Sequence, residues 1–281
     1  MKDEKYWYQE WKNAAERSTF SEIYPQADLC WDHAASTYDL GMGNSLERVD
    51  VVLEELKKMG YSRDTLQSVL DVGSGTGTYT LPFAHIYKKV TAIDCSLEMN
   101  NCLRKKAEKT GRDITIITDD FMDHLFTNTY DLVFASMNPG TYRPDAFEKM
   151  LSLTKKVLIY VGIIPRPAVS SERRSLEEIL FDVKLTHGGS NDVKYPYELL
   201  KAKGYHPYIR EAACRWEYME DVELAIQRKK DLYEKVPQHH KNWKGELENY
   251  IQSQVVDGQI VQKGDSQLGI VICNVEEKIE K

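Results

Sequence analysis

The sequence predicts an α/β fold built on a doubly wound, mostly parallel sheet of seven strands. Short runs rich in β-branched residues alternate with helix-length segments between residues 68 and 164. Parallel strands need long crossover connections, usually helices, and this alternation supplies them. Three glycines on alternate positions follow the first of these strands. We expect an N-terminal helical cap before this core and a helical insertion before the last strand.

Five parallel strands and their connecting helices follow from this alternation. The strands are predicted at residues 68–72, 90–94, 114–118, 130–136 and 155–164. The helices between them are predicted at 78–89, 97–110 and 143–154. A further helix over 46–59 presents one apolar face and ends at Gly60, which suits a helix C-terminus.

The chain after Pro165 predicts two further helices and two long strands. Ser175 and Glu178 form a capping box for a helix that ends near Asp182, and a second helix covers about 196–203. The strands are predicted at 205–219 and 266–275. A hairpin needs only a few residues, so the helical stretch between these strands is an insertion, and we expect a lid there. The predicted division is a cap over 1–45 and a core over 46–281 that carries the lid at 220–258.

Composition excludes several classes of partner. The formal charge is −7, and no long basic run is present, so nucleic acid is not expected as a partner. No stretch of about 18 apolar residues could cross a membrane, and we expect a cytoplasmic protein, as a monomer or a homodimer. The five cysteines lack metal-ligand spacing, so no metal is expected.

The glycine run at Gly73, Gly75 and Gly77 marks a binding loop, because it follows a strand and opens a helix. A dinucleotide loop of the GxGxxG type would need glycine where Thr78 stands, and no GK[ST] follows for a phosphate loop. With Asp71 two residues before the first glycine, the stretch resembles the loop of class I S-adenosylmethionine-dependent methyltransferases. The resemblance covers about residues 46–165 and implies a Rossmann-like fold.

This resemblance also implies the residues that bind S-adenosylmethionine, whose product is S-adenosylhomocysteine. The glycine loop would receive the methionine carboxylate, and Asp94 at the end of the second strand would accept hydrogen bonds from the ribose. Asp120 and Phe121 would hold the adenine, with Asp119 in that role if the register shifts by one. The segment 134–140 would line the methyl-donor end. The cofactor-binding residues predicted are Asp71, Gly73, Ser74, Gly75, Gly77, Asp94, Cys95, Asp119, Asp120, Phe121, Ser136 and Tyr38.

The acceptor is less clearly marked, and the cap and lid resemble those of family members that methylate small molecules. Tyr38 would close over the cofactor with Trp31 bracing it, although both aromatics also suit plain core packing. Asn138 and Pro139 match the first half of the NPPY signature of amine methyltransferases, but Gly140 and Thr141 depart from it. The substrate candidates are Asn138, Tyr142, Arg166 and Arg174, with Arg173 beside them; the arginines equally suit a solvated helix start.

No catalytic residue is fixed by the sequence, because the sulfonium is already an activated electrophile and mainly needs alignment. The candidates for a catalytic role are His33, Tyr38 and His187. Two alternatives stay open. The acceptor could be a protein or a tRNA, or the chain could bind S-adenosylmethionine without turnover.

Overall fold

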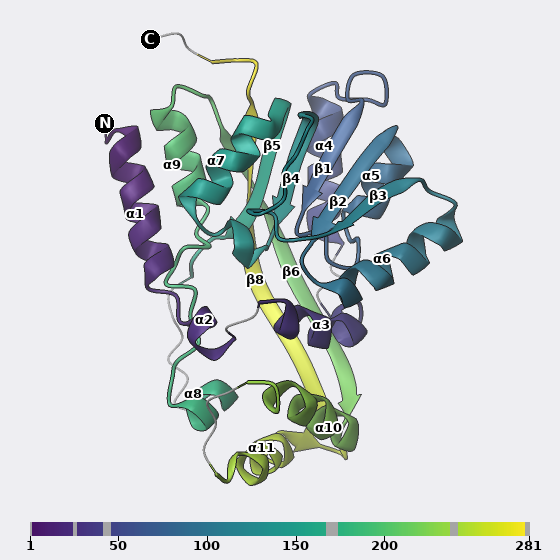
Figure 1. The fold of residues 1–281 in the computed structure, drawn as a ribbon, viewed down its shortest axis with the longest axis vertical. Coiled ribbons are helices and arrows are strands. Elements are labelled where there is room, and N and C mark those ends of the chain that lie inside the picture. Colours follow the sequence, from purple (N-terminus) through teal and green to yellow (C-terminus); the bar gives the residue numbers. More distant parts are fainter. Residues whose placement is uncertain (1, 25–26, 42–45, 167–173, 237–240, 279–281) are drawn as a thin grey trace.

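An eight-stranded sheet organises the chain, in the order β3-β2-β1-β4-β5-β8-β6 with β7 paired to β8 (Figure 1). The computed structural model describes residues 2–24, 27–41, 46–166, 174–236 and 241–278. The strands are β1 (Ser68–Val72), β2 (Lys89–Asp94), β3 (Ile114–Thr118), β4 (Tyr130–Ser136), β5 (Thr154–Ile163), β6 (Tyr208–Asp221), β7 (Val255–Val256) and β8 (Gln259–Asn274). The first five are parallel, and β8 runs antiparallel to both β5 and β6.

Helices precede, connect and follow these strands. They are α1 (Glu4–Glu16), α2 (Phe20–Ile23), α3 (Ala27–Tyr38), α4 (Glu47–Lys58), α5 (Thr80–Ile86), α6 (Leu97–Thr110), α7 (Pro144–Leu153), α8 (Leu176–Phe181), α9 (Lys194–Ala202), α10 (Val222–Tyr233) and α11 (Trp243–Gln252), with a 3-10 turn η2 (Pro139–Thr141) after β4. The doubly wound, mostly parallel sheet is confirmed. The seven strands predicted are present, and the two-residue β7 is an addition.

Alternate residues of each central strand face opposite sides of the sheet, so two hydrophobic clusters form. Leu70, Val133 and Leu158 belong to the cluster that is covered by α1, α7 and α9. Their neighbours Val69, Leu132 and Val157 belong to the cluster covered by α4 and α5. The strands therefore read as continuous apolar runs, as expected for a sheet that is buried on both faces.

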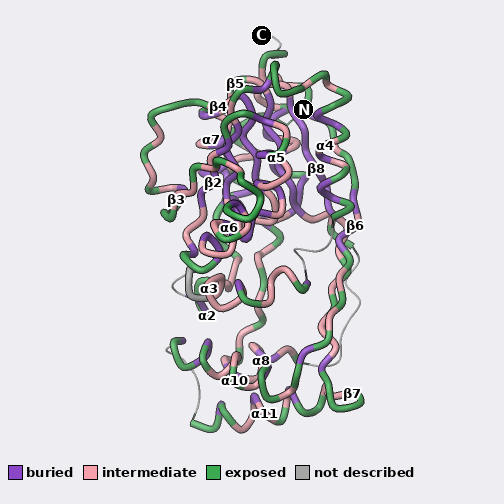
Figure 2. Tube along the Cα trace, turned by 90° about the vertical axis from the view of Figure 1, so that its right-hand side faces the viewer, coloured by how far each residue is buried: buried purple, intermediate pink, exposed green. Residues whose placement is uncertain are grey.

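Beyond the sheet, β6 and β8 continue as a two-stranded ribbon. The ladder between β5 and β8 stops at the pair Ile163–Leu268, whereas β6 and β8 stay paired as far as Asp221 and Gln259. The predicted last strand, which starts at 266, is therefore shorter than β8, which starts at Gln259. The cause is that only Ile260 is buried among residues 259–265 and the others are half-buried or exposed, so no apolar alternation marks a strand there (Figure 2).

The ribbon carries α10 and α11 at its far end, which confirms helices in the predicted insertion (Figure 1). These helices pack with α2 and α8 around a separate group of buried residues, which we call the distal cluster. Leu232, Leu247 and Trp243 come from the insertion, Leu180 from α8 and Ile23 from α2. The three helices of the predicted cap thus lie in three places: α1 on the sheet, α2 in the distal cluster and α3 beside α6.

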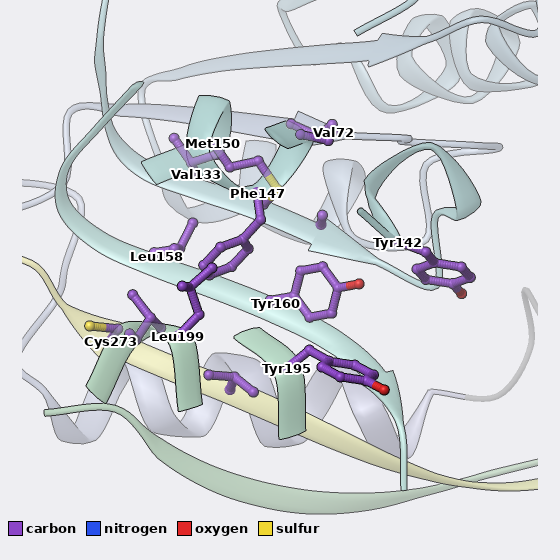
Figure 3. Packing of buried hydrophobic residues seen from close by; sticks show 14 of the residues in the cluster. Val72, Val133, Tyr142, Phe147, Met150, Leu158, Tyr160, Tyr195, Leu199 and Cys273 are labelled. Carbon is purple, nitrogen blue, oxygen red and sulfur yellow. The ribbon is translucent and has the colours of Figure 1, made fainter. Parts of the chain in front are cut away.

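Trp11 fixes α1 on the sheet. Its indole is fully buried, stacks on Tyr195 with the ring centroids 6.0 Å apart, and meets Phe147 and Tyr160 at steeper angles. Its Nε1 donates a hydrogen bond of 2.8 Å to the carbonyl of Ser190. Figure 3 shows the side chains of Phe147, Tyr160 and Tyr195 gathered in this cluster.

We expect Trp11→Ala to lower the free energy of unfolding by about 3–5 kcal/mol, because it leaves a large cavity and an unpaired Ser190 carbonyl. Urea denaturation followed by circular dichroism measures the loss. Lys5→Ala on the exposed side of the same helix is the matched control and should change stability by less than about 0.5 kcal/mol. Equal effects of the two substitutions would contradict the role of Trp11.

Candidate active site

A cavity of about 500 Å³ opens at the carboxyl ends of β1, β2, β3 and β4. The chain runs outward from β1 to β2 and β3, and then crosses back to β4 and β5 on the other side of β1. Ligands of open α/β sheets bind at such a reversal of strand order. The predicted cofactor residues that line this first cavity are Tyr38, Gly73, Gly75, Asp94, Cys95, Asp119, Asp120, Phe121 and Ser136.

Gly73 brings the first strand into close contact with the end of β4. Its φ is +71°, and a Cβ there would lie 2.3 Å from Nδ2 of Asn138. That nitrogen donates a hydrogen bond of 3.3 Å to the carbonyl of Val72. Gly75 also has a positive φ. A Cβ there would meet no protein atom within 4 Å, because the residue faces the cavity. The loop therefore offers bare backbone to a ligand.

Asp94 ties the glycine loop to the end of β2. Its Oδ2 accepts a hydrogen bond of 2.8 Å from the amide of Gly75, and its Oδ1 accepts one of 2.9 Å from the amide of Ser96. Burial raises the pKa of this carboxyl, and the two amides act in the opposite direction. A carboxylate that retains free lone pairs beside a cavity can accept hydrogen bonds from a pair of sugar hydroxyls.

Three predicted cofactor residues support the loop from behind and do not line the cavity: Asp71, Ser74 and Gly77. Gly77 is needed for packing, since a Cβ there would lie 2.4 Å from Cδ1 of Leu103 on α6. The Asp71 carboxyl accepts a hydrogen bond of 2.6 Å from Oγ1 of Thr80 at the start of α5. Burial raises the pKa of Asp71 from 3.8 to about 7.

The loop after β3 is held from α7. Nζ of Lys149 donates hydrogen bonds of 2.7, 2.9 and 2.8 Å to the carbonyls of Phe121, Met122 and His124. Asp119 is engaged by Nδ1 of His124 at 2.8 Å, and this contact lowers the pKa of the carboxyl. Both Asp119 and Asp120 line the cavity, so the choice between them stays open.

Two aspartates fasten α3 over the glycine loop. Asp32 Oδ1 accepts hydrogen bonds from Oγ of Ser96 at 2.5 Å and from the amide of Glu98 at 3.1 Å, both at the start of α6. Asp39 accepts a hydrogen bond of 2.6 Å from Oγ1 of Thr76 and pairs with Nζ of Lys106 at 2.6 Å.

Trp31 and Tyr38 of the same segment line the cavity. The two aspartates were missed as functional residues, although a spacing of seven, two helical turns, places them on one side of a helix. Asp39 itself follows the last residue of α3.

A second cavity of about 550 Å³ adjoins the first, and Phe20, Ser21, Pro139 and Arg143 line both. Its other walls include Tyr8 and Lys12 of α1, together with Tyr142 and His187. Of the predicted substrate residues, Asn138 lines the first cavity and Tyr142 the second. Asn138 is already engaged, because its Oδ1 accepts a hydrogen bond of 3.0 Å from the amide of Gly140. Phe20 and Arg143 were not predicted, since no motif surrounds them.

Three other predicted site residues lie away from both cavities. His33 contacts Arg228 of α10, with 3.2 Å between Nε2 and Nη1, and burial together with that guanidinium lowers its pKa to about 4. Arg166 pairs with Asp265 of β8 at 3.2 Å, and Arg174 with Asp182 at 2.8 Å. Arg173 lies outside the described residues. The structure therefore does not bring these side chains together with the cofactor residues.

Neither a metal nor a membrane segment is indicated within the described residues. No group of three or more His, Cys, Asp or Glu side chains is placed to hold a metal ion. In the same part of the chain, no helix combines the length and the apolar character that crossing a membrane requires.

Comparison with known proteins agrees with this geometry. Residues 69–160 match the family model described as a methyltransferase domain. The Cypemycin N-terminal methyltransferase of a Streptomyces species is 33% identical over 87 residues, which cover 31% of this chain and 35% of that enzyme. The match thus spans about a third of the length of this curated relative.

Two solved structures are similar in outline. The YcgJ protein of Bacillus subtilis is 13% identical, with 83% of this chain and 100% of that chain covered and a TM-score of 0.48. The magnesium protoporphyrin IX methyltransferase of Synechocystis PCC 6803 is 15% identical, with 82% and 79% covered and a TM-score of 0.45. Because both TM-scores are below 0.5, neither likeness bears on the assignment.

The family match covers β1 to β5 and includes the glycine loop and Asp94. Residues 69–160 therefore match a methyltransferase domain, and the cofactor that such a domain implies is S-adenosylmethionine. The site fits that molecule, since Gly75 offers open backbone and the Asp94 carboxylate, which is bonded to the Gly75 amide, lines the same cavity.

Because Asp71 is buried, we expect the free energy of unfolding to depend on pH. Its folded pKa of about 7 exceeds the ordinary 3.8, so between these values the folded state binds more protons than the unfolded state. The free energy of unfolding should therefore fall as the pH rises through this window. We expect Asp71→Asn to flatten this fall and to be more stable than the native protein at pH 8, in urea titrations at several pH values. An unchanged slope would contradict the burial argument.

We expect Asp32 and Asp39 to hold the α3 segment more closely over the first cavity than packing of Trp31 and Tyr38 alone would. Asp39→Ala removes the contacts to Thr76 and Lys106, and we expect it to weaken binding of S-adenosylhomocysteine roughly tenfold, mainly through faster dissociation. Stopped-flow tryptophan fluorescence measures the dissociation rate, and calorimetry measures the affinity. Asp50→Ala, an exposed carboxylate on α4, is the matched control; equal affinities of both variants would rule out this role.

Proposed function

We propose that the protein transfers the methyl group of S-adenosylmethionine to a small molecule held in the second cavity. The observation that carries this proposal is the pair of adjoining cavities, about 500 and 550 Å³, that share the side chains of Phe20 and Arg143. Each lies within the range of small-molecule sites. A donor and an acceptor placed in them would meet across the shared wall.

When bound, S-adenosylmethionine supplies an electrophilic methyl group, and the chain has to hold and align it. Asp94 would accept hydrogen bonds from the ribose, and the loop at Gly73 and Gly75 would receive the methionine end. The α3 segment contributes Trp31 and Tyr38 to the wall of the site, and with the donor bound these rings would limit the access of water. Methyl transfer then needs the acceptor atom in line with the bond from sulfur to the methyl carbon.

A second candidate acceptor is an amino group at a chain terminus, because the curated relative is named as an N-terminal methyltransferase. The adjoining cavities favour the small molecule, since the second cavity has the volume of a typical small-molecule site. We also propose that the protein acts in the cytoplasm as a monomer or a homodimer and that it has no nucleic-acid partner. In this proposal it turns over its donor and does not merely bind it.

Asp94→Ala tests the donor site. It removes the carboxylate that faces the cavity and leaves the Gly75 amide unpaired, so we expect calorimetry to show at least a hundredfold weaker binding of S-adenosylhomocysteine. Asp113→Ala changes an exposed carboxylate just before β3 and should bind like the native protein. If the native protein binds neither S-adenosylmethionine nor its product, the proposal fails.

The acceptor class is tested with methyl-labelled S-adenosylmethionine. A cell extract is separated by ultrafiltration into small molecules and retained macromolecules, and each fraction is incubated with the protein. Label in the small-molecule fraction supports the proposal. Label confined to the macromolecules would indicate a protein or tRNA acceptor, and no label in either fraction, with tight donor binding, would indicate a binding protein.

A further inference from the structure

His187 lies on the wall of the second cavity, on a short loop that α1 and the residues after it hold in place. The amide of Thr19 donates a hydrogen bond of 3.0 Å to the carbonyl of Thr186, and Trp11 Nε1 donates one to the carbonyl of Ser190. Between them Gly188 has φ +61°, and a Cβ there would lie 2.2 Å from the carbonyl oxygen of Ala14. The loop is therefore fixed at both ends, and its glycine allows it to lie directly on α1.

Two aromatic rings hold the imidazole at the boundary between the cavities. The His187 ring stacks on Phe20 with the centroids 5.4 Å apart and meets the ring of Tyr142 edge to face at 5.3 Å. Phe20 lines both cavities. Tyr142 in turn lies near the phenol of Tyr38, which lines the first cavity and contributes to the raised pKa of Tyr142. The imidazole thus lies close to the donor side of the second cavity.

The ring nitrogens of His187 are available to a ligand. No hydrogen bond joins either of them to another residue in the described part of the chain. Burial lowers the pKa of the imidazole below its ordinary 6.5, so the ring is neutral near pH 7 and can accept a proton.

The other charged groups that face the second cavity are paired with one another. Lys12 lies 3.9 Å from Glu16 on α1, and Arg143 forms a two-pronged pair with Asp145, one contact of which is 2.6 Å. The phenol of Tyr142 has a raised pKa and stays protonated. Tyr8 completes the titratable groups of the wall. Besides these ion pairs and the serines of the wall, an acceptor therefore meets aromatic rings and one neutral imidazole, without an unpaired charge.

We propose that His187 is the general base of the methyl transfer and that the acceptor is a planar, uncharged molecule with an aromatic hydroxyl. This inference rests on the proposed function. The acceptor oxygen forms a bond to the methyl carbon while the bond from that carbon to sulfur breaks, and the electron pair of the broken bond stays on the sulfur of S-adenosylhomocysteine. The hydroxyl proton passes to a ring nitrogen of His187 and then to water.

The aromatic hydroxyl fits better than an amine or a carboxylic acid for electrostatic reasons. An ammonium group would need an unpaired carboxylate, and a carboxylate would need an unpaired cation, because each loses hydration on entering the cavity. Glu16, Asp145, Lys12 and Arg143 are engaged with each other. A neutral phenol loses less hydration and gives up its proton as the new bond forms.

The test uses His187→Gln, which keeps a polar side chain of similar reach but cannot act as a base near neutral pH. The probes are phenol, catechol and naphthol, with benzylamine, naphthylmethylamine, benzoate and naphthoate as the charged amines and acids of similar size. Production of S-adenosylhomocysteine is measured for each. We expect methylation of at least one hydroxyl probe, and with His187→Gln a loss of about a hundredfold or more in kcat with KM within about threefold.

Two further measurements separate a catalytic role from a structural one. The native protein should show a rising limb of kcat with an apparent pKa below 6.5, which His187→Gln should lack. His206→Gln, an exposed histidine after α9, is the matched control and should keep the native rate. Calorimetry should show native-like binding of S-adenosylhomocysteine to His187→Gln, since this residue does not line the first cavity.

Three results would overturn the inference. They are an unchanged kcat in His187→Gln, faster methylation of an amine or an acid than of the matched hydroxyl, and no methylation of any hydroxyl probe by a protein that binds S-adenosylhomocysteine. Failure of the native protein to bind S-adenosylhomocysteine would instead overturn the proposed function, so the two failures are distinguishable.

Discussion

The contact between Gly73 and Asn138 is the constraint on which the rest of the site depends. It joins the ends of β1 and β4, the two neighbouring strands between which the chain reverses its direction across the sheet. Only a residue without a side chain fits there, because a Cβ would overlap the Asn138 amide. The close approach leaves the next turn of the loop, at Gly75, free to reach the Asp94 carboxylate. The first cavity is the space that this arrangement leaves open.

Around that contact, polar side chains hold the surrounding segments more than apolar packing does. Lys149 donates hydrogen bonds to three carbonyls of the loop after β3. Asp32 joins the α3 segment to α6, and Asp39 joins it to the glycine loop. Such hydrogen bonds fix direction as well as distance, which a cofactor site requires. Behind them, two apolar clusters keep the sheet rigid, so the site is assembled at the edge of a firm core.

The central strands could be predicted from the sequence because the sheet is buried on both faces, and nine of the proposed cofactor residues line one cavity at their ends. Apolar runs such as 130–136 mark such strands, and a ligand site at their carboxyl ends follows from the fold class. The ribbon at 259–265 could not be predicted, since Ile260 is its single buried residue and no apolar alternation results. Nor could the positions of His33 and Arg166, because both depend on contacts with Arg228 and Asp265, far away in the sequence. Phe20 and the second cavity depend on the same long-range packing.

The four-residue helix α2 belongs to two parts of the molecule at once. Phe20 lines both cavities, whereas Ile23 is buried in the distal cluster with α8, α10 and α11 (Figure 1). A displacement of α2 would therefore change both the wall of the cavities and the packing of the distal cluster. A substitution in the distal cluster would therefore reach the wall of both cavities through this one short helix.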